Sequence, residues 1–198
     1  MSGVIEVLEK PVVASLGVDS PGVAALVLAA PVFAAPVVVV MGVSGCGKST
    51  IGAVIADRLG VGFVDADSLH PLLNVGKMAA GIPLTDDDRW PWLATIGQVL
   101  ADAAQAGTGI VVACSALRRR YRDAIVAAAP SAQFVHLDGS KQVLSARLDG
   151  RSGHFMPPAL LDSQLATLEA LEADEPGRAV SIDASVAEVI ASAVAGIR

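Results

Sequence analysis

The stretch VVVVMGVSGCGKST, residues 37–50, decides the fold. Its four valines predict a buried β-strand, because β-branched residues favour strands. Gly42 to Ser49 fills the template G-x-x-x-x-G-K-S/T of a phosphate-binding loop, and a helical pattern begins near Lys48. This order of strand, loop and helix is the context that the motif requires. We therefore predict a nucleotide-phosphate site at the end of the first strand.

The residues of this loop have distinct expected roles. Glycines let backbone N–H groups turn toward phosphates at the positive end of a helix. Lys48 is expected to reach the β- and γ-phosphates, and Ser49 to ligate Mg²⁺. Thr50 contacts the α-phosphate or packs the first helical turn, and Cys46 fills space or carries a thiol of lowered pKa. The expected ATP contacts in the loop are Gly42, Val43, Ser44, Gly45, Cys46, Gly47, Lys48, Ser49 and Thr50.

Beyond the loop, apolar β-branched runs alternate with helical patterns over residues 37–198, which is typical of an α/β domain with a mainly parallel sheet. The pattern predicts strands at 37–41, 61–65, 109–113, 132–137 and 179–182. It predicts helices near 48–59, 89–106, 117–128, 140–149, 158–170 and 185–197. Ser185 with Glu188 forms a capping-box pattern that supports the start of the last helix. Residues 1–36 are an N-terminal extension of unknown role.

Composition excludes several classes of protein. Of the 198 residues 53% are hydrophobic and the net charge is −6, so the chain is not wholly disordered and phosphate backbones would repel it. The uncharged run at 22–40 nearly has the length of a membrane span, but Pro31 and Pro36 interrupt it and its end reads as strand followed by loop. We therefore expect neither nucleic-acid binding nor a membrane span. Two cysteines fit a reducing compartment, so we expect a cytoplasmic protein.

A second polar cluster follows the second predicted strand. Asp65 and Asp67 alternate with one intervening residue at the strand's end, so they face the same side of the backbone. Asp65 suits a Mg²⁺-bound water, whereas Asp67 suits either the proton of an acceptor hydroxyl or a helix cap. His70, before Pro71, either binds a polyol or is a hydrogen-bonded structural histidine. The cluster predicts phosphoryl transfer to a hydroxyl group.

More specific segments extend over most of the chain. They are DxDxLHPxxNxxKM at 65–78, GIPLTDDDRWPWL at 81–93, CSAL at 114–117, YRD at 121–123, RSGHF at 151–155 and SQLATLE at 163–169. In this order the segments resemble the gluconokinase family, P-loop small-molecule kinases that are related to shikimate kinase and phosphorylate D-gluconate at its 6-hydroxyl. The resemblance spans about residues 37–197. It departs from the family pattern at Leu171, where the family usually has proline, and over residues 1–36, which have no counterpart.

The resemblance implies a three-layer P-loop kinase fold with a five-stranded sheet and a small lid at about residues 149–158. It implies ATP and D-gluconate as substrates, Mg²⁺ as cofactor and a homodimer. By similarity, Arg89 holds the substrate carboxylate, with a surface ion pair as its alternative role. Arg151, in the lid, closes over the γ-phosphate. The implied catalytic residues are Lys48, Asp67 and Arg151.

The remaining implied contacts divide between the two substrates. Arg147 either joins Arg151 beside ATP or is an exposed helix residue, and Lys77 either contacts the polyol or is solvated. Arg122 is expected to turn toward the site while the other arginines of the run 118–122 lie in solvent. The implied acceptor contacts are Asp67, His70, Lys77, Arg89, Ser115, Arg122 and His154, and the metal contacts are Ser49 and Asp65.

Two alternatives stay open at this point. One is a kinase of the same architecture that acts on another sugar acid, a polyol or a shikimate-like hydroxy acid. The other, from a different class, is a catalytically silent nucleotide-binding regulator.

Overall fold

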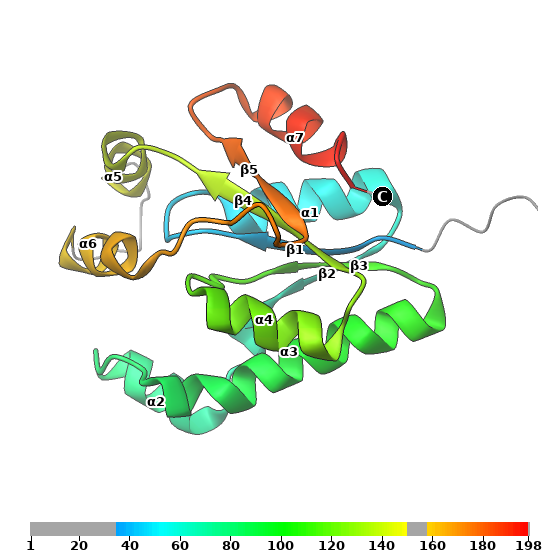
Figure 1. Ribbon diagram of the computed structural model, residues 1–198. Coiled ribbons are helices and arrows are strands. Elements are labelled where there is room, and N and C mark those ends of the chain that lie inside the picture. Colours follow the sequence, from blue (N-terminus) through cyan, green and yellow to red (C-terminus); the bar gives the residue numbers. More distant parts are fainter. Residues whose placement is uncertain (1–34, 150–157, 198) are drawn as a thin grey trace, which may run out of the picture. The chain divides into compact units, whose positions relative to one another are not determined.

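A five-stranded sheet forms the centre of the fold (Figure 1). The computed structural model describes residues 35–149 and 158–197. The strand order is β2-β3-β1-β4-β5, and every neighbouring pair is parallel. The strands are β1 (Val37–Met41), β2 (Gly62–Asp65), β3 (Ile110–Ala113), β4 (Ala132–Asp138) and β5 (Gly177–Ser181). The predicted α/β class is confirmed, and each strand end lies within two residues of its predicted position.

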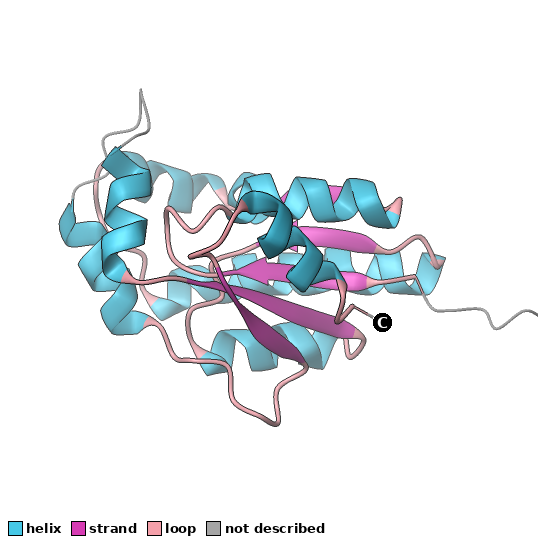
Figure 2. Cartoon of the chain, turned by 90° about the horizontal axis from the view of Figure 1, so that it is seen from above, coloured by secondary structure: helices cyan, strands magenta, loops and turns pink. Residues whose placement is uncertain are grey.

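Helices cover both faces of this sheet and give it three layers (Figures 1 and 2). The α1 and α7 helices pack on one face, and α3 and α4 pack on the other. The helices are α1 (Lys48–Leu59), α2 (Leu72–Ala79), α3 (Asp86–Ala106), α4 (Arg119–Ala128), α5 (Lys141–Asp149), α6 (Pro158–Thr167) and α7 (Val186–Val194), with the 3₁₀ helix η1 at Ala66–Leu69. The capping box predicted at Ser185 and Glu188 is present at the start of α7.

The valines of β1 show why the strand is apolar at every position. Val38 and Val40 belong to the core that includes α1 and α7, whereas Val37, Val39 and Met41 belong to the core that includes α3 and α4. Successive side chains of a strand face opposite sides, so a strand with helices on both faces has no solvated side. β1 is also paired along both edges, with β3 and with β4.

The helical region after β2 differs most from the prediction. Neither η1 nor α2 was predicted, because α2 lacks an apolar stripe directed at the core: Leu72 and Leu73 are 89% and 83% exposed. The α3 helix begins at Asp86 rather than near 89, since Thr85 and Asp88 form a capping box there. The α6 and α7 helices each end three residues earlier than predicted, at Thr167 and Val194.

Parts of two expected segments fall outside the described residues. These are residues 1–34 of the expected extension and residues 150–157 of the expected lid. Arg151 and His154 lie in the second segment, so their expected roles stay predictions. Among the residues that the structure describes, no helix is both long and apolar enough to cross a membrane.

The topology selects one edge of the sheet for a ligand. β1 has β3 on one side and β4 on the other, so the chain leaves β1 where the strand order changes direction. In open α/β sheets ligands bind beyond the carboxyl ends of the strands at such a point. The segment at this point is the glycine-rich loop that follows Met41.

The close approach of α3 and α4 provides a stability test. A Cβ added at Gly97 would lie 2.6 Å from the Cβ of Ala128, whereas one added at Gly76 in α2 would meet no atom within 4 Å. Overpacking costs about 1–3 kcal/mol, so we expect Gly97→Ala to lower the free energy of unfolding. Gly76→Ala, the matched control, should raise it by up to about 1 kcal/mol through helix propensity alone. Urea unfolding measures both, and equal effects would contradict the tight α3–α4 contact.

Candidate active site

The loop between β1 and α1 has the backbone shape that its motif predicts. Gly42 and Gly47 have φ of 140° and 99°, a region that strains any residue with a Cβ. A Cβ at Gly42 would also lie 2.8 Å from the carbonyl oxygen of Leu137. Within the described residues, the start of α1 has no side-chain cap and no acidic residue in its first turn. Its first N–H groups are thus left for an anion.

Two hydrogen bonds stabilise this loop, one between two of its own residues and one to the side chain of a residue in α6. Lys48 Nζ donates to the carbonyl of Val43 at 3.1 Å, and the backbone N–H of Ser44 donates to Oε1 of Gln164 at 2.6 Å. Sequence reasoning assigned no role to Gln164, although it lies in the family-like segment SQLATLE. That segment was the available signal, but residue spacing does not reveal a contact between positions so distant in sequence.

Arg147 reaches the other side of the loop from α5. Its guanidinium donates to the carbonyl of Cys46 at 3.3 Å and to that of Ile182, just after β5, at 2.8 Å. The structure therefore places Arg147 beside the loop, as the ATP-side prediction requires. Thr50 lies exposed in the first turn of α1. Burial raises the pKa of the Cys46 thiol, so the alternative of a lowered pKa at this position is wrong.

Ser49 and Asp65 join the phosphate loop to the end of β2. Ser49 Oγ donates to Asp65 Oδ2 at 2.6 Å, and the other carboxylate oxygen accepts the backbone N–H of Asp67 at 3.1 Å. Asp65, and not Asp67, is therefore the residue that caps the turn after β2. The Asp67 side chain is exposed, and its carboxylate has no hydrogen-bond or ion-pair partner within the described residues. One carboxylate is tied to the loop and the other is left for a ligand.

His70 lies in a stacked and partly buried position beside Asp67. Its ring stacks on that of Trp92, with centroids 4.3 Å apart and planes inclined by 11°. Asn74 Nδ2 lies 3.5 Å from His70 Nδ1. Burial lowers the pKa of His70, the positive charge of Arg89 lowers it further, and the negative charge of Asp67 opposes both. A neutral ring that accepts from Asn74 at Nδ1 carries its proton on Nε2, where it can donate to a hydroxyl.

Lys77 forms an ion pair across the same region. Its Nζ lies 2.5 Å from Asp88 Oδ1, and this hydrogen bond, followed by those from Thr85, lowers the pKa of Asp88 to about 2. The pair connects α2 to the capping box of α3. Lys77 is therefore not a freely solvated helix residue, because Asp88 balances its charge.

Arg89, in contrast, has no carboxylate within ion-pair distance among the described residues. It donates to the carbonyl of Leu84 and lies 5.9 Å from the centroid of the Tyr121 ring. The alternative role of Arg89, a surface ion pair within residues 86–89, is therefore wrong. Its positive charge is available to an anionic group.

Ser115 follows β3 at the same edge of the sheet. Its carbonyl accepts the N–H of Gly42 at 3.3 Å, so the end of β3 is joined to the phosphate loop. The neighbouring Cys114 is buried, and burial raises its pKa to about 12 despite the positive charge of Lys48 nearby. A thiol of such a pKa is not a nucleophile at neutral pH. Small residues here bring the backbone close to the loop.

Arg122 is placed differently from its predicted role. Its guanidinium is 1% exposed and pairs with Glu175, Nε to Oε1, at 2.5 Å. Its other N–H groups donate to the second carboxylate oxygen of Glu175 and to backbone carbonyls, so none is left for a substrate. The expectation that Arg122 contacts the acceptor is wrong. Helix spacing indicated which side of the helix Arg122 occupies, but it could not reveal that the buried carboxylate of Glu175 lies on that side.

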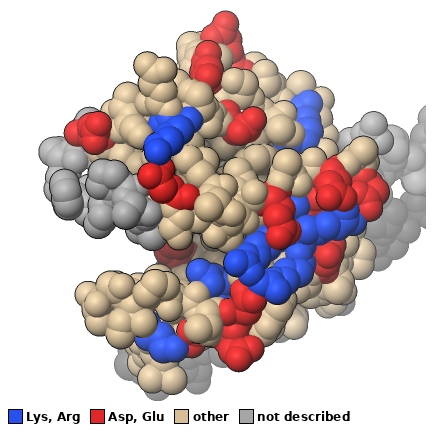
Figure 3. All heavy atoms as spheres, turned by 60° about the vertical axis from the view of Figure 1, so that its left-hand side comes forward, with Lys and Arg blue, Asp and Glu red and all other residues tan. Residues whose placement is uncertain are grey.

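The other arginines of the run lie at the surface beside acidic side chains. Figure 3 shows basic and acidic residues interleaved on this face. The run therefore forms no continuous basic stripe within the described residues. The ion pairs are Arg118 and Arg120 with Asp86, and Arg119 with Asp123, Glu172 and Asp174.

The fold and this site define the class of P-loop kinases: a phosphate loop at the switch point of a parallel sheet, with carboxylates at the end of β2, two strands away. Comparisons with known proteins agree. A family model described as "AAA domain" matches residues 37–171. A gluconokinase of Gluconobacter oxydans is 52% identical over 138 residues, which are 70% of this chain and 78% of that protein.

Two further relatives cover more of the chain. The thermosensitive gluconokinase of Escherichia coli is 43% identical over 166 residues, covering 81% of this chain and 88% of its own. The crystal structure of a gluconokinase from Sinorhizobium meliloti has 49% identity and a TM-score of 0.75, covering 82% of this chain and 91% of that chain. The chain belongs to the gluconokinase family.

The surroundings of His70 predict its titration. Because its pKa is lowered, the neutral ring is favoured in the folded protein. The stability that depends on the neutral ring is complete above the unfolded pKa of about 6.5 and decreases as the pH falls below it. An NMR titration should place the midpoint of His70 below that value. His70→Gln identifies the resonance, and a midpoint above the unfolded value would show that the Asp67 charge outweighs burial.

Proposed function

We propose that this protein transfers the γ-phosphoryl group of MgATP to the 6-hydroxyl of D-gluconate, giving 6-phospho-D-gluconate and ADP. The observation that carries the proposal is the difference in environment between the carboxylates of Asp65 and Asp67. Asp65 is hydrogen-bonded to Ser49 of the phosphate loop, whereas Asp67 is exposed and without a partner in the described part of the chain. The identity of the relatives named as gluconokinases supports the acceptor.

The nucleotide side follows from the phosphate loop. Its N–H groups and the start of α1 suit the β-phosphate, and Lys48 is close enough to exchange its Val43 contact for phosphate oxygens. Ser49 and Asp65 fit Mg²⁺, which prefers oxygen ligands and is usually held by one or two protein groups together with phosphates. No group of three His, Cys, Asp or Glu in the described residues could hold a metal alone. Bound Mg²⁺ would neutralise charge on the transferred group.

The acceptor side is assigned to groups near Asp67. Gluconate carries one carboxylate and a row of hydroxyls, so its site needs a cation and several polar groups. Arg89 supplies the unpaired cation, and His70 Nε2 and Ser115 supply polar contacts. Asp67 accepts the proton of the 6-hydroxyl as the oxygen attacks phosphorus. Lys77 contributes indirectly, through Asp88, by fixing α2 against α3.

Replacement of Asp67 tests the general base. Loss of a positioned base typically costs about 10²–10⁴-fold, so we expect Asp67→Asn to lower kcat by that range with little change in the KM for MgATP. Asp87→Asn is the matched control, since Asp87 is also exposed and lies in the first turn of α3. Steady-state ADP release with and without D-gluconate provides the measurement. Near-normal kcat in Asp67→Asn would remove Asp67 as base, and a wild type without gluconate-dependent ADP release would favour the silent regulator.

Replacement of Arg89 tests the carboxylate contact. A hydrogen bond to a charged group contributes about 1.5–3 kcal/mol, so Arg89→Ala should raise the KM for D-gluconate roughly 10–100-fold and leave that for MgATP nearly unchanged. Arg120→Ala is the control, because Arg120 also lies over the Tyr121 ring, 5.6 Å from its centroid, but is paired with Asp86. An effect confined to MgATP would refute the assignment. A panel of sugar acids assayed with ATP separates D-gluconate from other acceptors.

A further inference from the structure

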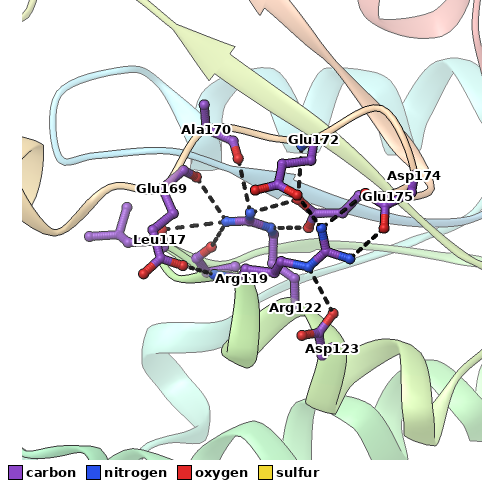
Figure 4. A network of polar contacts seen from close by, with 10 residues as sticks. Leu117, Arg119, Arg122, Asp123, Glu169, Ala170, Glu172, Asp174 and Glu175 are labelled. Atoms are coloured by element: carbon purple, nitrogen blue, oxygen red, sulfur yellow. Dashed lines mark hydrogen bonds and ion pairs between the residues drawn. The ribbon is translucent and has the colours of Figure 1, made fainter.

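Arg122 and Glu175 form a buried ion pair between α4 and the segment before β5 (Figure 4). Their side chains are 1% and 3% exposed. Besides Nε to Oε1, Arg122 Nη2 donates to Glu175 Oε2 at 2.8 Å, and the same oxygen accepts the N–H of Glu172. A planar guanidinium has five N–H donors, and here all of them are used.

The remaining donors hold two backbone segments together. Arg122 Nη1 donates to the carbonyls of Ala116 and Leu117 at 3.3 and 3.4 Å, in the turn after β3. It also donates to the carbonyl of Glu169 at 3.1 Å, and Nη2 donates to that of Ala170 at 3.2 Å, both after α6. Figure 4 shows the carbonyls of Leu117, Glu169 and Ala170 around the guanidinium of Arg122. Arg122 thus joins the turn after β3 to the segment that leads to β5.

The turn that Arg122 holds is strained. Ala116 has φ of 41° and is the non-glycine residue with a positive φ among those that the structure describes. Such a conformation costs about 1–3 kcal/mol and persists only where its surroundings impose it. The carbonyl of Ser115, on one side of Ala116, accepts from Gly42, and that of Leu117, on the other, accepts from Glu169. The hydrogen bonds from Arg122 are the side-chain contribution to this constraint.

Stability alone does not account for the pair. Replacing a buried ion pair by apolar side chains of similar volume is often neutral or stabilising, because desolvation offsets much of the attraction. What apolar side chains cannot supply are donors directed at the carbonyls of the turn. The specific contribution of Arg122 is therefore the geometry of residues 115–117.

We propose that Arg122 and Glu175 are positioning residues that fix the strained turn at Ala116 and thereby place Ser115 against the acceptor substrate. This inference rests on the proposed function, which assigns Ser115 to that side. The phosphate loop meets this turn through the hydrogen bond from Gly42 to Ser115, but Lys48, Gln164 and Arg147 also hold it, so the nucleotide side depends less on the pair than the acceptor side does. The pair should consequently affect the two substrates unequally.

The test is a double replacement, Arg122→Met with Glu175→Leu, which removes both charges and keeps the interior filled. We expect a folded protein whose KM for D-gluconate rises at least about tenfold, since misplacing a group by about 1 Å can cost 100-fold. The KM for MgATP should change less than about twofold. Arg122→Lys keeps the charge but not the fork of donors, so it should show the same unequal effect.

Arg119→Met is the matched control. Arg119 lies on the same helix and binds the same 169–175 segment through Glu172 and Asp174, but its side chain is 33% exposed and bonds no carbonyl of the turn. Its loss removes surface ion pairs of small net contribution, so both KM values should stay within about twofold of wild type. A change in the KM for D-gluconate as large as that of the double variant would overturn the inference.

Hydrogen exchange supplies a readout that does not depend on turnover. In folded Arg122→Lys, amides of residues 114–118 should exchange faster than in the wild type, while those of residues 43–50 keep their wild-type exchange rates. A double variant that folds with both KM values unchanged, or unchanged exchange at 114–118, would overturn the inference. Wild-type turnover of D-gluconate is measured first, because its absence refutes the proposed function alone. If D-gluconate is not turned over, the acceptor identified in the sugar-acid panel replaces it in the same comparison of KM values and exchange rates.

Discussion

The two-sided pairing of β1 is the constraint on which the rest of the structure depends. β1 is hydrogen-bonded to β3 and to β4, and helices cover both of its faces, so it cannot shift without breaking two ladders and two cores. The phosphate loop therefore leaves the sheet from a fixed point. Gly42 extends this constraint sideways, because its N–H donates to Ser115 after β3. The phosphate loop and Ser115 are thus positioned by adjacent strands of one sheet.

Two carboxylates of the same type acquire different roles from local hydrogen bonds. Both oxygens of Asp65 are engaged, one by Ser49 and one by the N–H of Asp67, whereas the Asp67 side chain is exposed. The turn η1 causes this difference, since it begins immediately after β2 and uses Asp65 as its cap. An ordinary capping interaction therefore distinguishes the carboxylate that is tied to the phosphate loop from the one that is exposed.

Local patterns predicted the strands, the phosphate loop and the positions of Ser49 and Asp65, because these depend on neighbouring residues and on the parallel topology. The family resemblance, and not a local pattern, pointed to Arg147, whose contacts lie with Cys46 and Ile182. The α2 helix was missed because it is short and its apolar side chains Leu72 and Leu73 are exposed, so they do not form a stripe that faces the core. Arg122 was misassigned and Gln164 was given no role for one shared reason. Their partners, Glu175 and the N–H of Ser44, are brought near them only by the tertiary fold.

An acidic chain that binds two anions must leave a few cations without carboxylate partners. Lys48, Arg89 and Arg147 meet this condition among the described residues, since each donates to a backbone carbonyl and none lies in an ion pair. Arg119, Arg122 and Lys77 are instead balanced by acidic side chains. A carbonyl holds a cation in place without cancelling its charge, whereas a carboxylate cancels it. The local positive field of this site therefore depends less on how many cations surround it than on which kind of oxygen holds each one.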